Sequence, residues 1–566
     1  MAIGSSSRED FQDGAAPGPQ EPLLSNGSSL FEMRDRPRRD VGWLVAYLVI
    51  LTTSLVGGVF SFIHRNTRYD ELTSHGIEKP ELCPITATTH SARRLLQQGP
   101  DAPSPFNLEA FVQAIGAWVG ASLGGSILVG LLFLWLARVK PAILVAAAIV
   151  LQVAVPTWLG LVALSQSRWV PALACLFVAG LLALVFWRLR QQIELVTHLL
   201  GLSGRGLAAN PWLVPMALGL QLGLAAVLEI PLLLAVGGAM RNGTLVYNSA
   251  RVDQGSAARA DQCVNSDGDS VNCCEWQVEA WVNGYLVVAF IAMLWSMFLV
   301  FQIKMFTVAG TIAQWYFQPT SATDEQGPNR SRTLTSLRFA LGPSLGSLCA
   351  GSAVLTLVSI VRRMLQKLRR DGTTNLFAAC LAACLSLLLS LVEFVTQFAT
   401  VRAAITGEAF FTAGRNVVAL LKRNLMDAFG VWWLPPLVLQ SSSFLLAVAW
   451  GFLAYKISSA TTWSRMAGWS PEQVYSMTLL TAVLAFLAGW AVLSFLASLL
   501  LNVIDALFVC FAMDRELGQV SSPAVYNIIS KLPSVGAVVQ QPDGGLVYGA
   551  PPEQQRNPFP GSVARV

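Results

Sequence analysis

Two acidic residues lie within apolar stretches that are long enough to cross a membrane. Glu229 is in the run AAVLEIPLL, two residues before Pro231, and Glu393 is in the run SLLLSLVEFVTQF. Carboxylates retained at membrane depth usually face protein or water and serve an ion or a substrate. A carboxylate at a proline-broken helix suits a small organic cation or a proton. The structural alternative is an acid that pairs with Lys304 or backbone donors, or that is protonated and neutral.

Aromatic and amide side chains accompany these acids. A single apolar stretch carries Trp295, Gln302, Trp315 and Tyr316. A quaternary ammonium group donates no hydrogen bonds, so proteins hold it against aromatic faces, at ~0.5–2 kcal/mol per contact. Membrane proteins also place tryptophan and tyrosine at the bilayer interfaces, which is the commoner role of any single such residue. The candidate substrate-binding residues in these stretches are Glu229, Trp295, Gln302 and Glu393.

The other motifs point away from enzyme chemistry. GASLG at 120–124 and GPSLG at 342–346 match the G-x-S-x-G pattern of serine hydrolases. That pattern needs a strand–turn–helix elbow with a histidine and an acid nearby, whereas both segments here are in stretches that predict apolar helices. The 4 histidines show no His/Cys ligand spacing for a metal, and the sequence has no phosphate-binding G-x-x-x-x-G-K-[ST] loop. We expect no enzyme activity, no metal and no cofactor.

The composition is that of a membrane protein. Hydrophobic residues make up 54% of the 566 residues and charged residues 13%, whereas soluble proteins carry about 25% charged residues. The 17 tryptophans and 28 phenylalanines suit helices that are anchored at both bilayer interfaces. The net charge of +5 is spread through loops, which excludes nucleic acid as a partner. We expect an all-α integral membrane protein whose main partner is the lipid bilayer.

The pattern of apolar stretches predicts about ten transmembrane helices, since each reaches the ~20 residues that a spanning helix needs. Arginines before the first stretch favour a cytoplasmic N-terminus, and an even number of spans returns the C-terminus to the same side. We expect disordered cytoplasmic tails at 1–40 and 513–566 and a polytopic transmembrane domain at 41–512. The spans are expected at roughly 41–63, 111–137, 141–165, 169–190, 212–239, 284–317, 338–362, 374–401, 427–455 and 473–511.

This topology puts two long loops, 64–110 and 240–283, on the outer side of the membrane. They contain four cysteines, for which an oxidising compartment makes one or two disulfides plausible, in any of three full pairings. Asn242-Gly-Thr244 is a glycosylation sequon on the same side, close to the bilayer. The disulfide candidates are Cys83, Cys263, Cys273 and Cys274.

One basic segment conflicts with the topology. Residues 362–371 follow the seventh span and include Arg362, Arg363 and Lys367, yet they would lie outside, against the positive-inside tendency. Long, bent seventh and eighth helices would resolve the conflict, as would a basic turn that is held by protein.

Three segments occur in a recognisable order along the chain. They are AGTIAQWYF with the following SLRFALGPSLGSLCAGSAVLTLVSIVRRMLQKL, then ITGEAFFTAGRNVVALLKRN, and finally FVCFAMDRELGQVSSPAVYNIISKLP. In this order and spacing they resemble the choline transporter-like proteins, a family of solute carriers. With a weaker match around Ile193 to Pro211, the likeness covers most of residues 190–533.

The resemblance implies a ten-helix carrier that moves choline, and ethanolamine as a further candidate, by alternating access without sodium or ATP. It implies the plasma membrane, with the Golgi or endosomal membrane as the alternative. Trp315 and Tyr316 fall in the family's AGxxAxWYF block, and this resemblance adds both to the candidate substrate-binding residues. The chain departs from the family at Ser344, at Thr396–Thr400 and at Phe411, which bears on the substrate more than on the fold. A channel, a lipid-handling protein on the same scaffold and a non-transporting membrane scaffold stay as alternatives.

Overall fold

The structure is a computed structural model. The parts of the chain that it describes are residues 36–66, 69, 108–188, 190–247, 263–264, 270–271, 274–317, 330–370, 376–423, 425–461, 471–517, 521–522, 525, 538–540 and 546–548.

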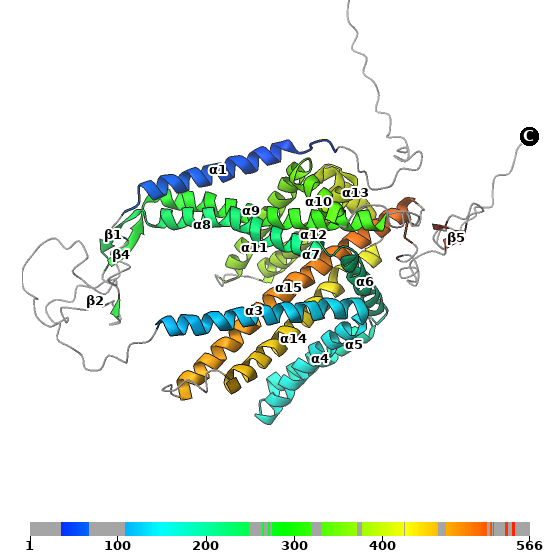
Figure 1. The fold of residues 1–566 in the computed structure, drawn as a ribbon, viewed down its shortest axis with the longest axis horizontal. Coiled ribbons are helices and arrows are strands. Elements are labelled where there is room, and N and C mark those ends of the chain that lie inside the picture. The colour runs from blue at the N-terminus through cyan, green and yellow to red at the C-terminus, as the bar shows by residue number, and fades with distance from the viewer. Residues whose placement is uncertain are drawn as a thin grey trace, which may run out of the picture.

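The described chain is mainly helical, as expected (Figure 1). Up to the first strand, the helices are α1 (Val41–Ile63), α3 (Leu108–Val139), α4 (Pro141–Ser165), α5 (Trp169–Arg188), α6 (Arg190–Ala209), α7 (Leu213–Gly219), the π-helical turn η2 (Leu220–Leu224) and α8 (Ala225–Met240). After the strands come α9 (Ala280–Tyr316), α10 (Arg330–Leu341), α11 (Leu345–Arg370), α12 (Leu376–Thr406), α13 (Phe410–Arg423), α14 (Leu425–Thr461) and α15 (Pro471–Leu517).

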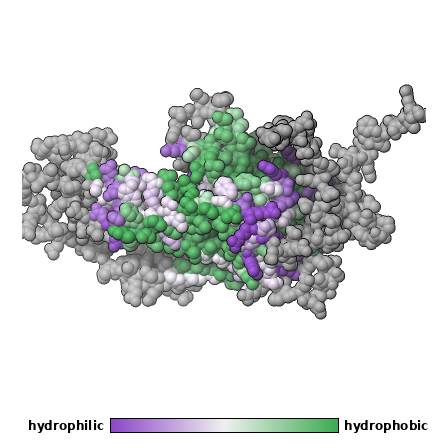
Figure 2. Space-filling view, turned by 90° about the horizontal axis from the view of Figure 1, so that it is seen from above, coloured by the Kyte–Doolittle hydropathy of each residue, from purple (hydrophilic) through white to green (hydrophobic). Residues whose placement is uncertain are grey.

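Ten helices of the described part are long and apolar enough to span a membrane, which confirms the predicted fold class. Their apolar side chains are widely exposed, among them Val170 (81%) and Phe177 (72%), as expected of surfaces that contact lipid. Figure 2 shows a central band of hydrophobic residues between two more hydrophilic zones. The spans run Val41–Ile63, Trp118–Val139, Pro141–Ser165, Trp169–Arg188, Leu213–Met240, Ala280–Tyr316, Leu345–Lys367, Cys380–Thr406, Leu434–Ala460 and Val474–Glu516.

One predicted boundary is wrong. The seventh span was expected to begin near 338, but that region divides into α10 and α11. The break falls at Gly342-Pro343, because proline disfavours helical geometry in the residue before it and cannot donate a backbone hydrogen bond. The spanning helix therefore begins at Leu345.

The helices form two groups (Figure 1). In one, α1 packs on α8, and α9 packs on α8, α11 and α12. In the other, α14 packs on α15 and α4, and α3 packs on α15. The groups meet where α9 contacts α15. From Leu299 to Tyr316 almost every residue of α9 is buried, which identifies it as the central helix of the bundle.

Short antiparallel strands lie outside the bundle. β1 (Gly243–Tyr247) pairs with β4 (Cys274–Val278), forming a ribbon between α8 and α9 in the predicted outer loop. β2 (Cys263–Val264) pairs with β3 (Ser270–Val271), and β5 (Val538–Gln540) with β6 (Leu546–Tyr548). Cys83 and Cys273 lie outside the described residues, so the disulfides stay a prediction.

The end of the bundle opposite the β1–β4 ribbon is held together by many hydrogen bonds, and we call it the closed end (Figure 1). There, residues 36–40 of the predicted disordered tail dock on the helices. The Arg36 guanidinium donates to the carbonyl oxygens of Ala404 and Ile405, at 3.0 and 3.1 Å. The Asp40 carboxylate accepts hydrogen bonds from Ser347 Oγ, at 2.6 Å, and from the backbone N–H of Phe410, at 2.9 Å. Asp40 thereby satisfies an amide at the start of α13, and residues 36–40 pack on the helices although they were predicted to belong to a disordered tail.

Candidate functional site

A cavity of about 380 Å³ lies between the two groups of helices. One wall comes from α9, α11 and α12, and the other from α14 and α15. Its volume is within the range of small-molecule sites, which also tend to occur between the helices of a bundle. The lining residues are Phe301, Arg362, Ser390, Glu393, Phe394, Gln397, Phe398, Pro436, Ser498, Leu501, Asn502 and Asp505.

Aromatic rings and acids face this cavity together. Phe301 comes from α9, and Phe394 and Phe398 come from successive turns of α12, with their ring centroids 4.5 Å apart. Phe398 also meets Phe508 of α15 edge to face, at 5.9 Å, which fixes its ring. Rings that are held in this way offer π faces to a cation, and the Asp505 carboxyl group lies in the same space.

The first acid of the cavity, Glu393, is already paired. Arg362 Nη2 donates to Glu393 Oε2 at 2.8 Å, and it lies 3.5 Å from Ser390 Oγ. Glu393 therefore forms an ion pair, as the structural alternative to substrate binding predicts, but its partner is Arg362 and not Lys304. The next residue, Arg363, lies over the Phe290 ring at 5.1 Å. The start of the basic segment is therefore held by protein, which was one of the two expected solutions to its placement.

The second acid, Asp505, has no such partner. Among the residues that the structure describes, none makes a hydrogen bond or an ion pair with its carboxylate. Asn502, one turn earlier on α15, is buried and its Nδ2 is also unpartnered. Unpartnered polar groups within a protein are costly and typical of places where something binds. Asp505 and Asn502 therefore form the polar part of the site.

The predicted tryptophan and glutamine of α9 lie elsewhere. Trp295 is buried, and its indole N–H donates to Ser352 Oγ at 3.0 Å and to the carbonyl of Cys349 at 3.2 Å. It joins α9 to α11 and does not line the cavity. Gln302 is completely buried, and neither of its amide atoms has a partner.

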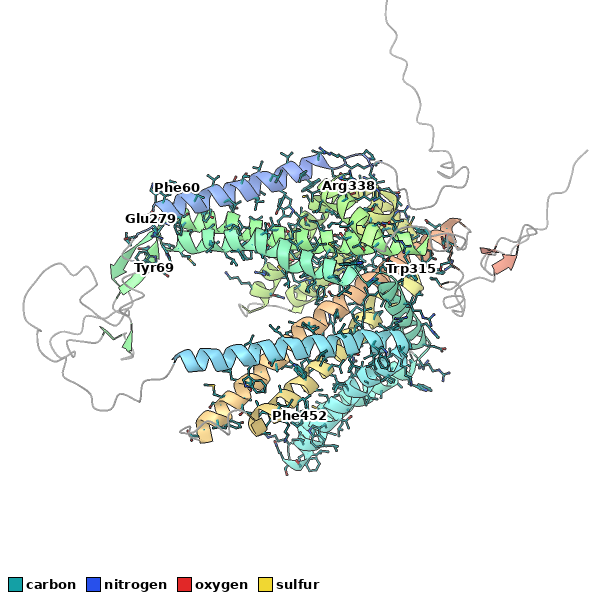
Figure 3. All side chains as sticks on the ribbon, viewed as in Figure 1. Phe60, Tyr69, Glu279, Trp315, Arg338 and Phe452 are labelled. Carbon is teal, nitrogen blue, oxygen red and sulfur yellow. The ribbon has the colours of Figure 1, made fainter. Side chains whose placement is uncertain are left out.

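Trp315 and Tyr316 are at the closed end. Figure 3 shows Trp315 and Glu279 at opposite ends of α9. The Tyr316 hydroxyl donates to Asp514 Oδ2 at 2.9 Å, and Asp514 also accepts hydrogen bonds from Ser521. A Cβ added to Gly206 of α6 would lie 3.4 Å from the Trp315 ring, an ordinary van der Waals distance, so α6 packs beside this ring. These two aromatic side chains pack between helices at the closed end and do not line the cavity.

Glu229 lies on α8, half-buried, with its Oε1 atom enclosed and without a hydrogen-bond partner. Pro231 stays inside the helix. The span departs from α-helical geometry at the π-helical turn η2, whose last residue, Leu224, is five residues before Glu229. Glu229 does not line the cavity either. Of the predicted site residues, the cavity therefore includes Glu393 alone.

Comparison with known proteins agrees with this architecture. The family model described as "Plasma-membrane choline transporter" matches residues 173–516, a range that includes every residue of the cavity. The chain belongs to this family.

Individual relatives are distant. "Choline transporter-like protein 3" of Bos taurus is 24% identical over 363 residues, which cover 63% of this chain and 50% of the relative. "Protein PNS1" of Gibberella zeae is 25% identical over 241 residues, covering 41% and 43%, and that of Neurospora crassa is 24% identical over 405 residues, covering 70% and 67%. The chain thus matches about half of the length of the first two relatives.

The sequon residue of this family member is engaged in the fold. Asn242 is buried, and its Nδ2 donates to the carbonyl oxygens of Ser61 and Gly238, both at 2.9 Å. A glycan on Nδ2 would have to displace these bonds between α1 and α8. Glycosylation stays a prediction, and one that requires this contact to open.

Asp505 is the site residue that sequence reasoning missed, and the signal was present. It stands in the run LLLNVIDALFVCF, an acid within an apolar stretch like Glu229 and Glu393. Because α15 continues to Leu517, Asp505 lies well within the helix. Among the described residues no group of three or more His, Cys, Asp or Glu could hold a metal ion.

Proposed function

We propose that this protein transports choline or a related small organic cation, ethanolamine included, by alternating access and without ATP hydrolysis. The observation that carries the proposal is the cavity between the two groups of helices, in which phenylalanine rings and the unpaired Asp505 carboxylate meet. Membership of the family supports the same substrate class. The plasma membrane is the proposed location, with the Golgi or endosomal membrane as the alternative.

The site suits a molecule with one quaternary ammonium head and one polar end. The head would lie against Phe301 and Phe398, where each cation–π contact contributes ~0.5–2 kcal/mol. Asp505 would balance its charge. Because Asn502 and Ser498 line the same space, they are suited to hydrogen-bond the substrate hydroxyl. Glu393 is less suited to the cation, since Arg362 already neutralises it.

The arrangement of the helices supports alternating access. The cavity has α9, α11 and α12 on one side and α14 and α15 on the other, so movement of one group against the other would change its access. By the predicted topology the closed end is cytoplasmic. The hydrogen bonds between Tyr316, Asp514 and Ser521 would then have to open to release substrate into the cell.

The test is uptake of labelled choline by the purified protein in liposomes. We expect saturable uptake that quaternary ammonium analogues inhibit and that needs no ATP. Flux that rises linearly with choline concentration would instead indicate a channel. Movement of a labelled choline phospholipid without choline uptake would indicate a lipid-handling protein, and no flux of either would indicate a scaffold.

A further inference from the structure

A buried lysine lies directly behind the wall of the cavity. Lys304 is 3% exposed and lies in the C-terminal half of α9. Its Nζ lies 5.3 Å from the centroid of the Phe301 ring and 5.8 Å from that of Phe495. Nζ also donates a long hydrogen bond, 3.4 Å, to Ser498 Oγ. In the described part of the chain no carboxylate forms an ion pair with it.

This environment resembles a cation site. Two aromatic rings and one hydroxyl hold the ammonium, which is how proteins bind cationic ligands that lack a counter-ion. Two of its three contacts, Phe301 and Ser498, also line the cavity. A cation that enters the cavity would therefore contact two of the residues that hold Lys304, from the opposite side.

The cavity holds the complementary group. Asp505 faces it without a protein partner in the described residues, so the bundle contains an unpaired cation and an unpaired carboxylate on either side of the same wall. Isolated charges at membrane depth are unfavourable, and ionisable residues there usually pair with each other or with a ligand. A lysine has a flexible four-carbon stem, so its ammonium can change position while its backbone stays in place.

We propose that Lys304 is an internal substitute for the substrate cation. The inference rests on the proposed transport function and adds a step to it. When the cavity is empty, the Lys304 ammonium moves past Phe301 and Ser498 towards Asp505 and neutralises it. When an organic cation binds, charge repulsion returns Lys304 to the pocket of Phe301, Phe495 and Ser498.

The physical consequence concerns the return step of the transport cycle. A carrier that reorients while empty has to move its cavity with Asp505 uncompensated, unless a group of the protein supplies the positive charge. A carrier that exchanges one cation for another always has a substrate bound when it reorients. Loss of Lys304 should therefore impair net uptake and spare exchange.

The experiment compares these two modes in liposomes that contain the purified full-length chain. Net uptake is measured into choline-free vesicles, and exchange is measured into vesicles loaded with unlabelled choline. For Lys304→Gln we expect net uptake to fall about tenfold while exchange stays within about twofold of wild type, because only the empty carrier lacks its counter-charge. The KM of exchange should fall, since a tethered competitor has been removed.

Two further variants separate this role from a structural one. Lys304→Arg keeps the positive charge and should retain net uptake. Lys456→Gln is the matched control, because Lys456 also lies over a phenylalanine, Phe452 at 5.5 Å, but is exposed on α14 away from the cavity (Figure 3 labels Phe452). It should leave both modes unchanged.

The outcomes are distinguishable. If Lys304→Gln reduces net uptake and exchange equally, or reduces neither, Lys304 is no substitute cation, although choline transport stands. If wild type shows no choline flux in either mode, the proposed function itself fails. Should Lys304→Gln not fold, as judged by gel filtration, Lys304→Met is the second variant, and the same comparison of the two modes decides.

Discussion

The cavity and the closed end differ in how their polar groups are satisfied. At the closed end, Tyr316, Ser521 and Arg36 all hydrogen-bond to partners that lie far away in the sequence or on other elements. In the cavity, Asp505 and the amide nitrogen of Asn502 have no partner among the described residues. Satisfied polar networks specify one structure, whereas unsatisfied groups that line a cavity are available to a ligand. Substitutions at the closed end should therefore affect stability, and substitutions in the cavity should affect transport.

The largest effect is expected for Asp505→Asn. Removing the charge that balances the substrate should lose about 2 kcal/mol of binding, comparable to a hydrogen bond to a charged group, which corresponds to a roughly 30-fold fall in kcat/KM. Initial rates of choline uptake in liposomes measure it. The matched control is Glu472→Gln, in the exposed first turn of the same helix, for which we expect no change. Normal transport by Asp505→Asn would exclude this carboxylate from the site.

The next effect is expected at the closed end, for Tyr316→Phe. Asp514 is buried and would lose one of its donors, at about 1.5–3 kcal/mol for a hydrogen bond to a charged group. We expect a fall in the midpoint of thermal unfolding by about 2 °C or more, with the KM for choline little changed. Tyr475→Phe, on the exposed outer part of α15, should leave the midpoint unchanged. A large rise in KM without loss of stability would contradict the division into two regions.

A smaller effect is expected for the ion pair at the cavity. Glu393 and Arg362 are both about two-fifths exposed, and pairs of this kind contribute about 0–1 kcal/mol. Glu393→Gln should therefore reduce uptake by only about threefold, mainly because it leaves the Arg362 charge to repel the substrate. The double variant with Arg362→Gln should recover part of the loss, which a double-mutant cycle on kcat/KM measures. If Glu393→Gln abolished choline uptake and the double variant restored none of it, Glu393 would be the acid that binds substrate.

The smallest effect is expected for Glu229→Gln, although the sequence alone predicts that this change reduces uptake. Glu229 does not line the cavity, and glutamine preserves its shape, so KM should stay within about twofold of wild type. Uptake and surface expression in cells are the measurements. A strong loss of uptake with normal expression would show that the path of the substrate includes α8 and that the cavity is only part of it.

The sequence is sufficient to predict the spans because hydropathy is a local property of about twenty residues. It predicts the division into α10 and α11 less well. The apolar pattern continues across Gly342-Pro343, although the helix is interrupted there in the structure. The helices α6, α10 and α13 carry too little apolar sequence to be counted as spans, and the sequence analysis does not predict them as separate helices.

The site is harder to predict because it depends on which helices meet. Glu393 and Asp505 are more than one hundred residues apart, and only the packing of α12 near α15 brings them to one cavity. The family block that contains Trp315 and Tyr316 is recognisable in the sequence, but its position along α9 puts these rings at the closed end. Likewise Trp295 has the chemistry of a cation site, but its donor is used to join α9 to α11.

The most direct test of the account is a structure of the protein determined with saturating choline. We expect the ammonium group to lie within ~6 Å of the Phe301 and Phe398 ring centroids, beside the Asp505 carboxylate. Choline bound next to Glu229 or Trp315, with the cavity between α12 and α15 free of ligand, would contradict it.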